Sequence, residues 1–305
     1  MQHLVTTLGP IGEREAGIIL AHEHVFVDLR TPDNPEHGQA AAGEVIAVMA
    51  PELKRAKADG IGVIVEASCL GVGRRADILL AVSKATGFPL VAPTGVYREP
   101  WIPAWVRDAS EDRLFEWMRG ELSGDIGGSG VRAGWIKLSA GDDGLTKCET
   151  KVLRAAVRAA KETGAAIGSH TIRGRVMKDQ LGILEALGLD PARFIWIHSQ
   201  AEEDFSIHLE AARRGAWLEY DGIGSPDTDS KYVGSILKVL DAGYGNKLLL
   251  SQDRGQYNPA EPRGGEQKPY TYIVDEFLPK LGTAGVDGET IRRLTRINPF
   301  RAFGR

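Results

Sequence analysis

The sequence predicts a single α/β domain built as a (β/α)₈ barrel of parallel strands. Eight short apolar segments alternate with longer amphipathic segments along the 305 residues, and no linker or change of composition divides the chain. A barrel of this type takes ~250 residues plus insertions, so one domain over residues 1–305 is expected. No Gly-x-Gly-x-x-Gly sequence opens the first helix, which disfavours an open dinucleotide-binding sheet.

The expected strands are rich in Ile, Val, Leu and Trp. Gly, Pro or Asp residues bound them, which is typical of buried parallel strands. In chain order they are 17–25, 62–68, 89–96, 134–140, 165–170, 194–199, 216–221 and 247–252.

The amphipathic segments between these strands are the expected helices, and three of them end at a glycine that can cap the helix. They are 147–163 before Gly164, 201–214 before Gly215, and 229–242 before Gly243. After the eighth strand, residues 254–268 show no periodic pattern. A loop of that length in a compact domain is usually functional.

The composition favours a cytoplasmic protein with a small-molecule partner. The net charge of −4 provides no general attraction to nucleic acid or to an anionic membrane. Cys69 and Cys148 are the only cysteines, which fits a reducing compartment without a disulfide framework. The first residues lack the pattern of a signal peptide, and no apolar run approaches the ~20 residues of a transmembrane helix.

Six residues that could bind metal lie at or near the ends of the expected strands. They are His22 and His24 on the first strand, Lys137 on the fourth, His170 on the fifth, His198 on the sixth and Asp253 on the eighth. Residues two apart on a strand point the same way, and the carboxyl ends of barrel strands form the reactive face. Imidazoles and a carboxylate suit zinc, iron, manganese or cobalt better than magnesium or calcium. The sequence therefore predicts a catalytic metal centre.

Lys137 adds a second metal to this prediction. An ammonium group buried beside divalent cations would be repelled, so it should lose its proton. The neutral amine can then react with carbon dioxide to form a carbamate. That anion could bridge two metals ~3.5–4 Å apart, the spacing of two-metal hydrolytic sites.

These residues and their surroundings resemble the phosphotriesterase-like family of the amidohydrolase superfamily, including its lactonases. The resemblance covers essentially the whole chain and includes Ala-His-Glu-His-Val (21–25), Arg-Ala-Gly-Trp-Ile-Lys (132–137), Ser-His-Thr (169–171) and Arg-Gly-Ala-Trp-Leu (214–218). It implies that His22, His24, Lys137 and Asp253 hold a more buried metal. Carboxylated Lys137, His170 and His198 would hold a more exposed one, with a hydroxide between the two metals.

The resemblance also implies a hydrolytic mechanism. The two cations would lower the pKa of a bridging water toward ~7, and the exposed metal would polarise a carbonyl or phosphoryl oxygen. Asp253 would take the proton and pass it to the leaving group. Ester, lactone and phosphoester hydrolysis all fit this scheme.

Three further side chains have open roles. Tyr97, after the third strand, resembles the lactonase tyrosine that leans over the metals; it either donates to a substrate oxygen or packs at the barrel mouth. Arg254 either clamps an anionic substrate group or pairs with a surface acid. Glu66 lies inside an apolar strand, so its carboxylate either supports the site from behind or forms an ion pair within the barrel.

The family's substrate markers are missing after the seventh strand. Lactonases that act on acyl-homoserine lactones carry an arginine there and strong triesterases a histidine, whereas this chain has Tyr-Asp-Gly-Ile-Gly-Ser (220–225). The main hypothesis is a lactonase or carboxylic esterase with promiscuous phosphotriesterase activity. Phosphotriester or phosphodiester hydrolysis as the main activity and a non-catalytic binding barrel are the alternatives. Analogy with the family also makes a homodimer possible.

Overall fold

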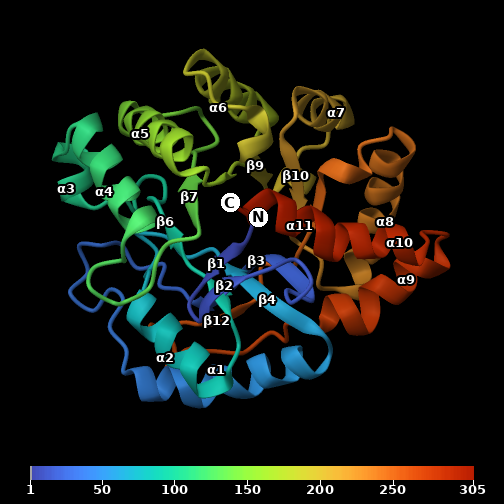
Figure 1. The fold of residues 1–305 in the computed structure, drawn as a ribbon, viewed down its shortest axis with the longest axis horizontal. Helices are drawn as coiled ribbons and strands as arrows, with labels where there is room; N and C mark the ends of the chain where they lie inside the picture. Colours follow the sequence, from blue (N-terminus) through green and yellow to red (C-terminus); the bar gives the residue numbers. More distant parts are fainter. Residues whose placement is uncertain (1) are drawn as a thin grey trace.

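The computed structural model describes residues 2–305 and confirms the (β/α)₈ barrel (Figure 1). Each of the eight predicted segments contains a strand, and the strands pair in parallel. The barrel strands are β3 Ile18–Phe26, β4 Ile61–Glu66, β5 Leu90–Val91 with β6 Pro93–Thr94, β7 Trp135–Ser139, β8 Ile167–His170, β9 Phe194–Ile197, β10 Trp217–Tyr220 and β11 Leu248–Leu250. Their parallel order brings all carboxyl ends to one face.

Helices surround the barrel, and α11 (Asn298–Phe303) lies across its end beside the two termini, as Figure 1 shows. They are α1 Ala42–Ala58, α2 Ala76–Thr86, α3 Ala104–Asp108, α4 Glu111–Ser123, α5 Lys147–Thr163, α6 Gly174–Ala186, α7 Phe205–Arg214, α8 Pro226–Asp241, α9 Leu278–Thr283, α10 Gly288–Arg292 and α11 Asn298–Phe303. α5 has the predicted bounds, because Thr146 caps its start and Gly164 ends it with a φ of 71°. α7 starts later than predicted, because a 3₁₀ turn comes first and Asp204 caps the helix.

The two chain ends close the barrel at the end opposite the strand carboxyl ends. A hairpin that the sequence analysis did not predict, β1 Leu4–Thr6 and β2 Gly9–Ile11, lies beside the C-terminus. His3 N donates to Arg305 O at 3.2 Å, and Arg305 N donates to His3 O at 3.1 Å. Inside the barrel the ring of Trp135 meets that of Phe303 edge-on, with centroids 5.2 Å apart. Buried apolar side chains therefore fill this end and leave the other to polar residues.

The barrel ladder is interrupted between its last and first strands. Within the described residues β11 forms no ladder with β3, so His22 N donates instead to Ser251 Oγ at 2.9 Å and Asp253 N to His22 O at 3.2 Å. β12 Gly255–Tyr257 then pairs in parallel with β3. The segment 254–268, expected to be a loop without regular structure, therefore begins with a strand.

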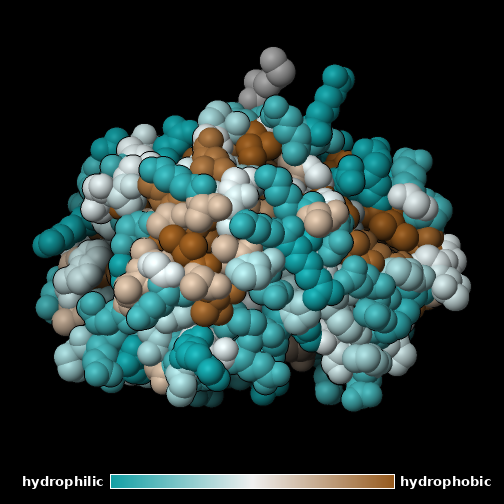
Figure 2. All heavy atoms as spheres, turned by 90° about the horizontal axis from the view of Figure 1, so that it is seen from below, coloured by the Kyte–Doolittle hydropathy of each residue, from teal (hydrophilic) through white to brown (hydrophobic). Residues whose placement is uncertain are grey.

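Hydrophilic side chains dominate the molecular face that Figure 2 shows, and the hydrophobic ones gather there in small patches. Among the described residues, Leu8 and Leu29 are the large apolar side chains with high exposure. No helix in the described part of the chain is long and apolar enough to cross a membrane.

Candidate metal centre

The structure brings all six predicted metal ligands to one cavity at the carboxyl ends of the strands. The cavity has a volume of about 140 Å³. Its polar lining consists of His22, His24, Tyr97, Lys137, His170, His198, Asp253 and Gln256. His24 Nε2 lies 3.0 Å from Asp253 Oδ1, and the rings of His170 and His198 are 4.4 Å apart at their centroids. Residues from β3 to the end of β11, far apart in the chain, thus share one site.

Lys137 is buried without an acidic partner. Its Nζ lies 3.5 Å from His22 Nε2, and within the described residues no carboxylate forms an ion pair with it. Burial lowers the pKa of Lys137, although Glu219 and Asp253 act in the opposite direction. A lysine in this position favours the neutral amine that carbamate formation requires.

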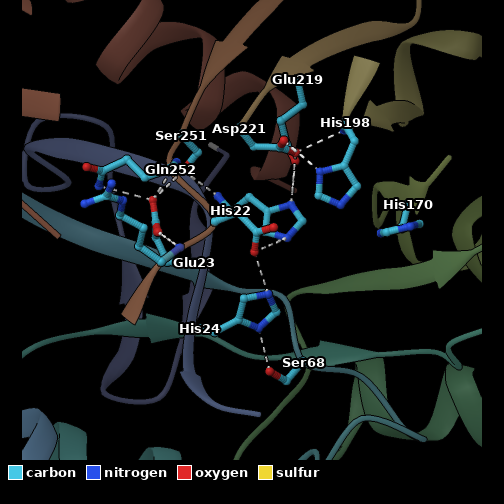
Figure 3. Close-up of polar contacts among 12 residues, drawn as sticks. His22, Glu23, His24, Ser68, His170, His198, Glu219, Asp221, Ser251 and Gln252 are labelled. Atoms are coloured by element: carbon cyan, nitrogen blue, oxygen red, sulfur yellow. Dashed lines mark hydrogen bonds and ion pairs between the residues drawn. The ribbon is translucent and has the colours of Figure 1, made fainter. Parts of the chain in front are cut away.

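Three of the four cavity histidines are oriented from behind by acceptors on neighbouring strands and loops (Figure 3). The Nδ1 distances are 2.8 Å from His22 to Glu219 Oε1, 2.7 Å from His198 to Asp221 Oδ1, and 2.7 Å from His24 to Ser68 Oγ. When Nδ1–H donates to such an acceptor, Nε2 is left with a free lone pair. The donor set therefore fits divalent transition metals.

Glu219 and Asp221 are functional residues that the sequence analysis missed. Both are fully buried on or just after β10, and Figure 3 shows their carboxylates over His22 and His198. Burial and the neighbouring Asp221 raise the pKa of Glu219, whereas contacts with His198 and His22 outweigh burial and lower the pKa of Asp221. The available signal was the pair of acids two residues apart in an apolar strand segment.

The cavity residues have opposite electrostatic tendencies. Burial, first of all, lowers the pKa of His22 to about 3. Burial also opposes protonation of His24, but Asp253 and Glu66 outweigh it and raise its pKa to about 9. His22 and His24 in turn lower the pKa of Asp253, against the effect of burial. His22 is thus neutral and ready to bind a metal, and Asp253 is an anion.

Glu23, between the two histidines of β3, joins the first strand to the eighth. Its buried carboxylate accepts hydrogen bonds from Ser251 Oγ at 2.8 Å, Gln252 N at 3.0 Å and Arg254 N at 2.7 Å. Figure 3 shows Glu23 directed toward Ser251 and Gln252, away from the cavity. Because these donors flank Asp253, Glu23 positions the end of the eighth strand where the ladder is interrupted.

Residues 2–303 match the model of the phosphotriesterase family. The chain belongs to the phosphotriesterase family. It is 30% identical over 327 residues to a phosphotriesterase homology protein of Mycobacterium tuberculosis, covering 100% of this chain and 98% of the relative.

Two further relatives carry names with a stated activity. An aryldialkylphosphatase of Saccharolobus solfataricus is 28% identical over 303 residues, covering 96% of each chain. A solved mutant of a Deinococcus radiodurans PTE-like lactonase superimposes with a TM-score of 0.88 at 30% identity, covering 99% of this chain and 100% of that one. These comparisons establish a phosphotriesterase-family hydrolase with the barrel predicted from the sequence.

Backbone conformation in this phosphotriesterase-family chain is unusual at two of the six predicted metal ligands. His198 and Asp253 have left-handed backbones, with φ of 61° and 54°. Residues other than glycine seldom adopt this region, and such positions cluster at functional sites. The turns direct both side chains into the cavity where their strands end.

The structure shows where Tyr97, Glu66 and Arg254 lie, the three residues whose roles the sequence left open. Tyr97 lines the cavity, with its hydroxyl 3.2 Å from His170 Nδ1. Glu66 lies behind His24, where it accepts hydrogen bonds from Val25 N and Ser68 N, so it supports the site from behind.

Arg254 is half-buried, with its guanidinium carbon 5.1 Å from the ring centroid of Tyr272. It forms no ion pair within the described residues, so the pairing with a surface acid is not found. Its role as an anion clamp stays a prediction.

Proposed function

We propose that this chain is a binuclear metal-dependent hydrolase that acts mainly on lactones or related carboxylic esters, with promiscuous phosphotriesterase activity. One observation carries the proposal: four histidines, an aspartate and a buried lysine without an acidic partner converge on one cavity. The name of the PTE-like lactonase structure supports the lactone part.

The six residues divide into two candidate ligand sets that share Lys137. His22, His24, Asp253 and carboxylated Lys137 would hold the more buried ion, and Lys137, His170 and His198 the more exposed one. Zinc is the first candidate, with iron, manganese or cobalt as alternatives. When bound, two such ions supply Lewis acidity and a water whose pKa falls toward ~7.

The chain's own side chains handle the proton and the substrate. Asp253 is an anion in contact with His24, which equips it to accept a proton from the attacking water and deliver it to the leaving group. Tyr97 keeps its proton, because burial raises its pKa to about 12 despite the opposing effect of Arg98. Its hydroxyl can therefore donate to a substrate oxygen above the cavity.

Phosphotriester or phosphodiester hydrolysis is the second candidate for the main activity. The Saccharolobus relative is named an aryldialkylphosphatase. Arg254, with no acid bound, could contact a phosphoryl oxygen of such a substrate.

A side-by-side substrate panel tests the proposed activity. The protein is purified, stripped with a chelator and reloaded with zinc, manganese or cobalt. It is then assayed on lactones, aryl esters, phosphotriesters and phosphodiesters. The proposal expects lactones or esters to have the highest kcat/KM. A higher kcat/KM for phosphoesters supports the second candidate, and inactivity on every substrate with both metals bound contradicts both.

Carboxylation of Lys137 is tested without an activity assay. Metal-loaded protein prepared with ¹³C-bicarbonate should show a carbamate carbon in its NMR spectrum. The Lys137→Met variant should lack this signal and bind less metal, as measured by elemental analysis. A full metal complement without a carbamate signal would contradict the bridging role.

A further inference from the structure

Arg98 directly follows the cavity residue Tyr97 in the loop after β6, and no acid within the described residues is bound to it. Its Nε is buried and has no hydrogen-bond acceptor. Within the described residues its guanidinium forms no ion pair, and its carbon lies 5.6 Å from the ring centroid of Trp101. An unsatisfied buried donor is costly, which calls for an explanation.

Two other half-buried arginines of this chain have acids bound to them. Arg30 binds Asp28, and Arg74 binds Glu121 with two nitrogens. Both pairs use the planar fork that matches a carboxylate. Arg98 has the same fork on a half-buried side chain, but the protein provides no anion for it.

Arg98 belongs to what we call the rim cluster, formed by Leu29, Tyr97, Arg98 and Trp101. The rings of Tyr97 and Trp101 meet edge-on with centroids 5.5 Å apart, and Trp101 Nε1 donates to Leu29 O at 2.8 Å. Leu29 and Tyr97 line the cavity. Arg98 therefore shares an aromatic cluster with two residues that face the site.

Hydrogen bonds of the backbone hold this loop in place. Tyr97 N donates to Leu70 O at 2.9 Å, and Trp101 N donates to Arg98 O at 2.9 Å. When a side chain on a fixed loop binds a ligand, no backbone has to be ordered, and only the side chain loses freedom. The backbone at Arg98 is thus preorganised, unlike that of an arginine on a mobile segment.

The charge of Arg98 lies beside the site. Its guanidinium carbon is close to the ring of Trp101, which packs edge-on against the ring of the cavity residue Tyr97. Arg254 contacts the site through its backbone N–H to Glu23, while its guanidinium lies over Tyr272. Of these two arginines, Arg98 is the one that packs in a cluster with cavity-lining residues.

We propose that Arg98 binds an oxyanion group of the substrate, so that the preferred lactone or ester carries a carboxylate or phosphate beside its scissile bond. This inference rests on the proposed hydrolase function and specifies its substrate class. Arg98 contributes to substrate binding, and the bond-breaking step remains with the cavity residues.

Matched substrates test the inference. The Arg98→Met variant is compared with the wild type on a carboxylate-bearing lactone, a phosphate-bearing lactone and the neutral methyl ester of the first. We expect kcat/KM for at least one anionic lactone to fall ~10- to 100-fold, mainly through KM. The neutral ester should change less than ~3-fold. The anionic lactone that suffers the larger loss identifies the oxyanion.

Two control variants separate this role from a structural one. Arg113→Met removes an exposed arginine that also lies over a tryptophan, 5.9 Å from the Trp105 centroid, and should behave as the wild type. Arg98→Lys keeps the charge, so it should recover part of the lost kcat/KM and should correct any folding defect of Arg98→Met. Equal losses on neutral and anionic substrates, or no loss at all, would overturn the inference.

A binding measurement keeps the inference separate from the proposed activity. Glutarate is titrated calorimetrically into metal-free wild type and metal-free Arg98→Met. The inference expects binding that weakens ~10-fold or more in the variant, even if the wild type were to hydrolyse none of the lactones. Equal affinities in the two proteins would contradict it, whatever the substrate panel shows.

Discussion

The floor and the rim of the cavity are built in opposite ways. At the floor, which we define as the six cavity ligands with Glu23, Glu219 and Asp221, most polar groups have a partner within the chain. At the rim, Arg98 and Arg254 lie against aromatic rings with no acid bound, and Leu29 is 56% exposed. The difference teaches that the protein itself supplies outer partners for most residues of the floor but supplies no acid for the arginines of the rim.

Removal of Lys137 should have the largest effect on this contrast. Lys137→Met takes away the residue that both proposed ligand sets share. We expect metal content to fall and activity to drop more than ~100-fold, beyond the usual effect of losing an outer partner. Lys247→Met, a half-buried lysine that donates to Gly215 O, is the matched control and should keep both. Full metal content in Lys137→Met would show that the floor does not depend on this lysine.

Asp221→Asn tests whether the outer partners of the histidines matter. The amide cannot accept from both His198 N and His198 Nδ1 as the carboxylate does, so metal affinity should fall ~10- to 100-fold. A competition titration with a metal-sensitive dye measures this affinity. The exposed Asp227→Asn should match the wild type, and equal affinities for the two variants would contradict the role of Asp221.

The Glu23→Gln variant tests whether the floor also stabilises the fold. The amide places N–H groups against donors that the carboxylate now accepts from, which should lower the free energy of unfolding by about 1–3 kcal/mol. Urea denaturation measures the change, with the exposed Glu13→Gln as the control. A stability equal to that of the control would mean that Glu23 does not join the first strand to the eighth.

His208, which is buried on α7 behind β10, should make the stability of the protein depend on pH. Its ring contacts Tyr220 OH at 2.7 Å and Glu202 O at 2.9 Å, and burial lowers its pKa below the ordinary 6.5. As pH falls through 6.5, His208 of the unfolded chain binds a proton, whereas the buried His208 of the folded protein binds one only at lower pH. Stability should therefore decline by up to about 1.4 kcal/mol per pH unit. The His208→Gln variant should be less stable overall, and this part of the dependence of its free energy of unfolding on pH should be missing. An unchanged dependence on pH would mean that other groups cause it.

The smallest effect is expected from an apolar rim residue. Leu29→Ser should leave metal content unchanged and alter the free energy of unfolding by less than ~0.5 kcal/mol. KM for substrates with apolar groups should rise a few-fold, since ~0.8 kcal/mol per buried methylene is lost. Leu8→Ser, which changes an exposed leucine on the opposite face, should leave KM unchanged. A large loss of stability in Leu29→Ser would mean that the rim stabilises the fold as the floor does, which would contradict the contrast between them.

The sequence alone predicted the barrel strands and the six residues of the cavity. Periodicity and apolar composition determine where strands form, and strand ends in a parallel barrel share one face, so residues such as His22 and Asp253 could be placed together without coordinates. The end of α5 was predicted to the residue because Gly164 is a local signal. These features depend on neighbours in the chain.

Tertiary structure alone decided how these residues are supported. Glu219 was missed because its role depends on His22, a residue 197 positions away in the chain that pairs with it only after the barrel closes. Arg98 showed no signal in the sequence, because its lack of a partner is visible only when every neighbouring acid has been placed. Local patterns thus determine which chemistry the chain holds. Long-range packing decides which polar groups are satisfied and which remain free for a substrate.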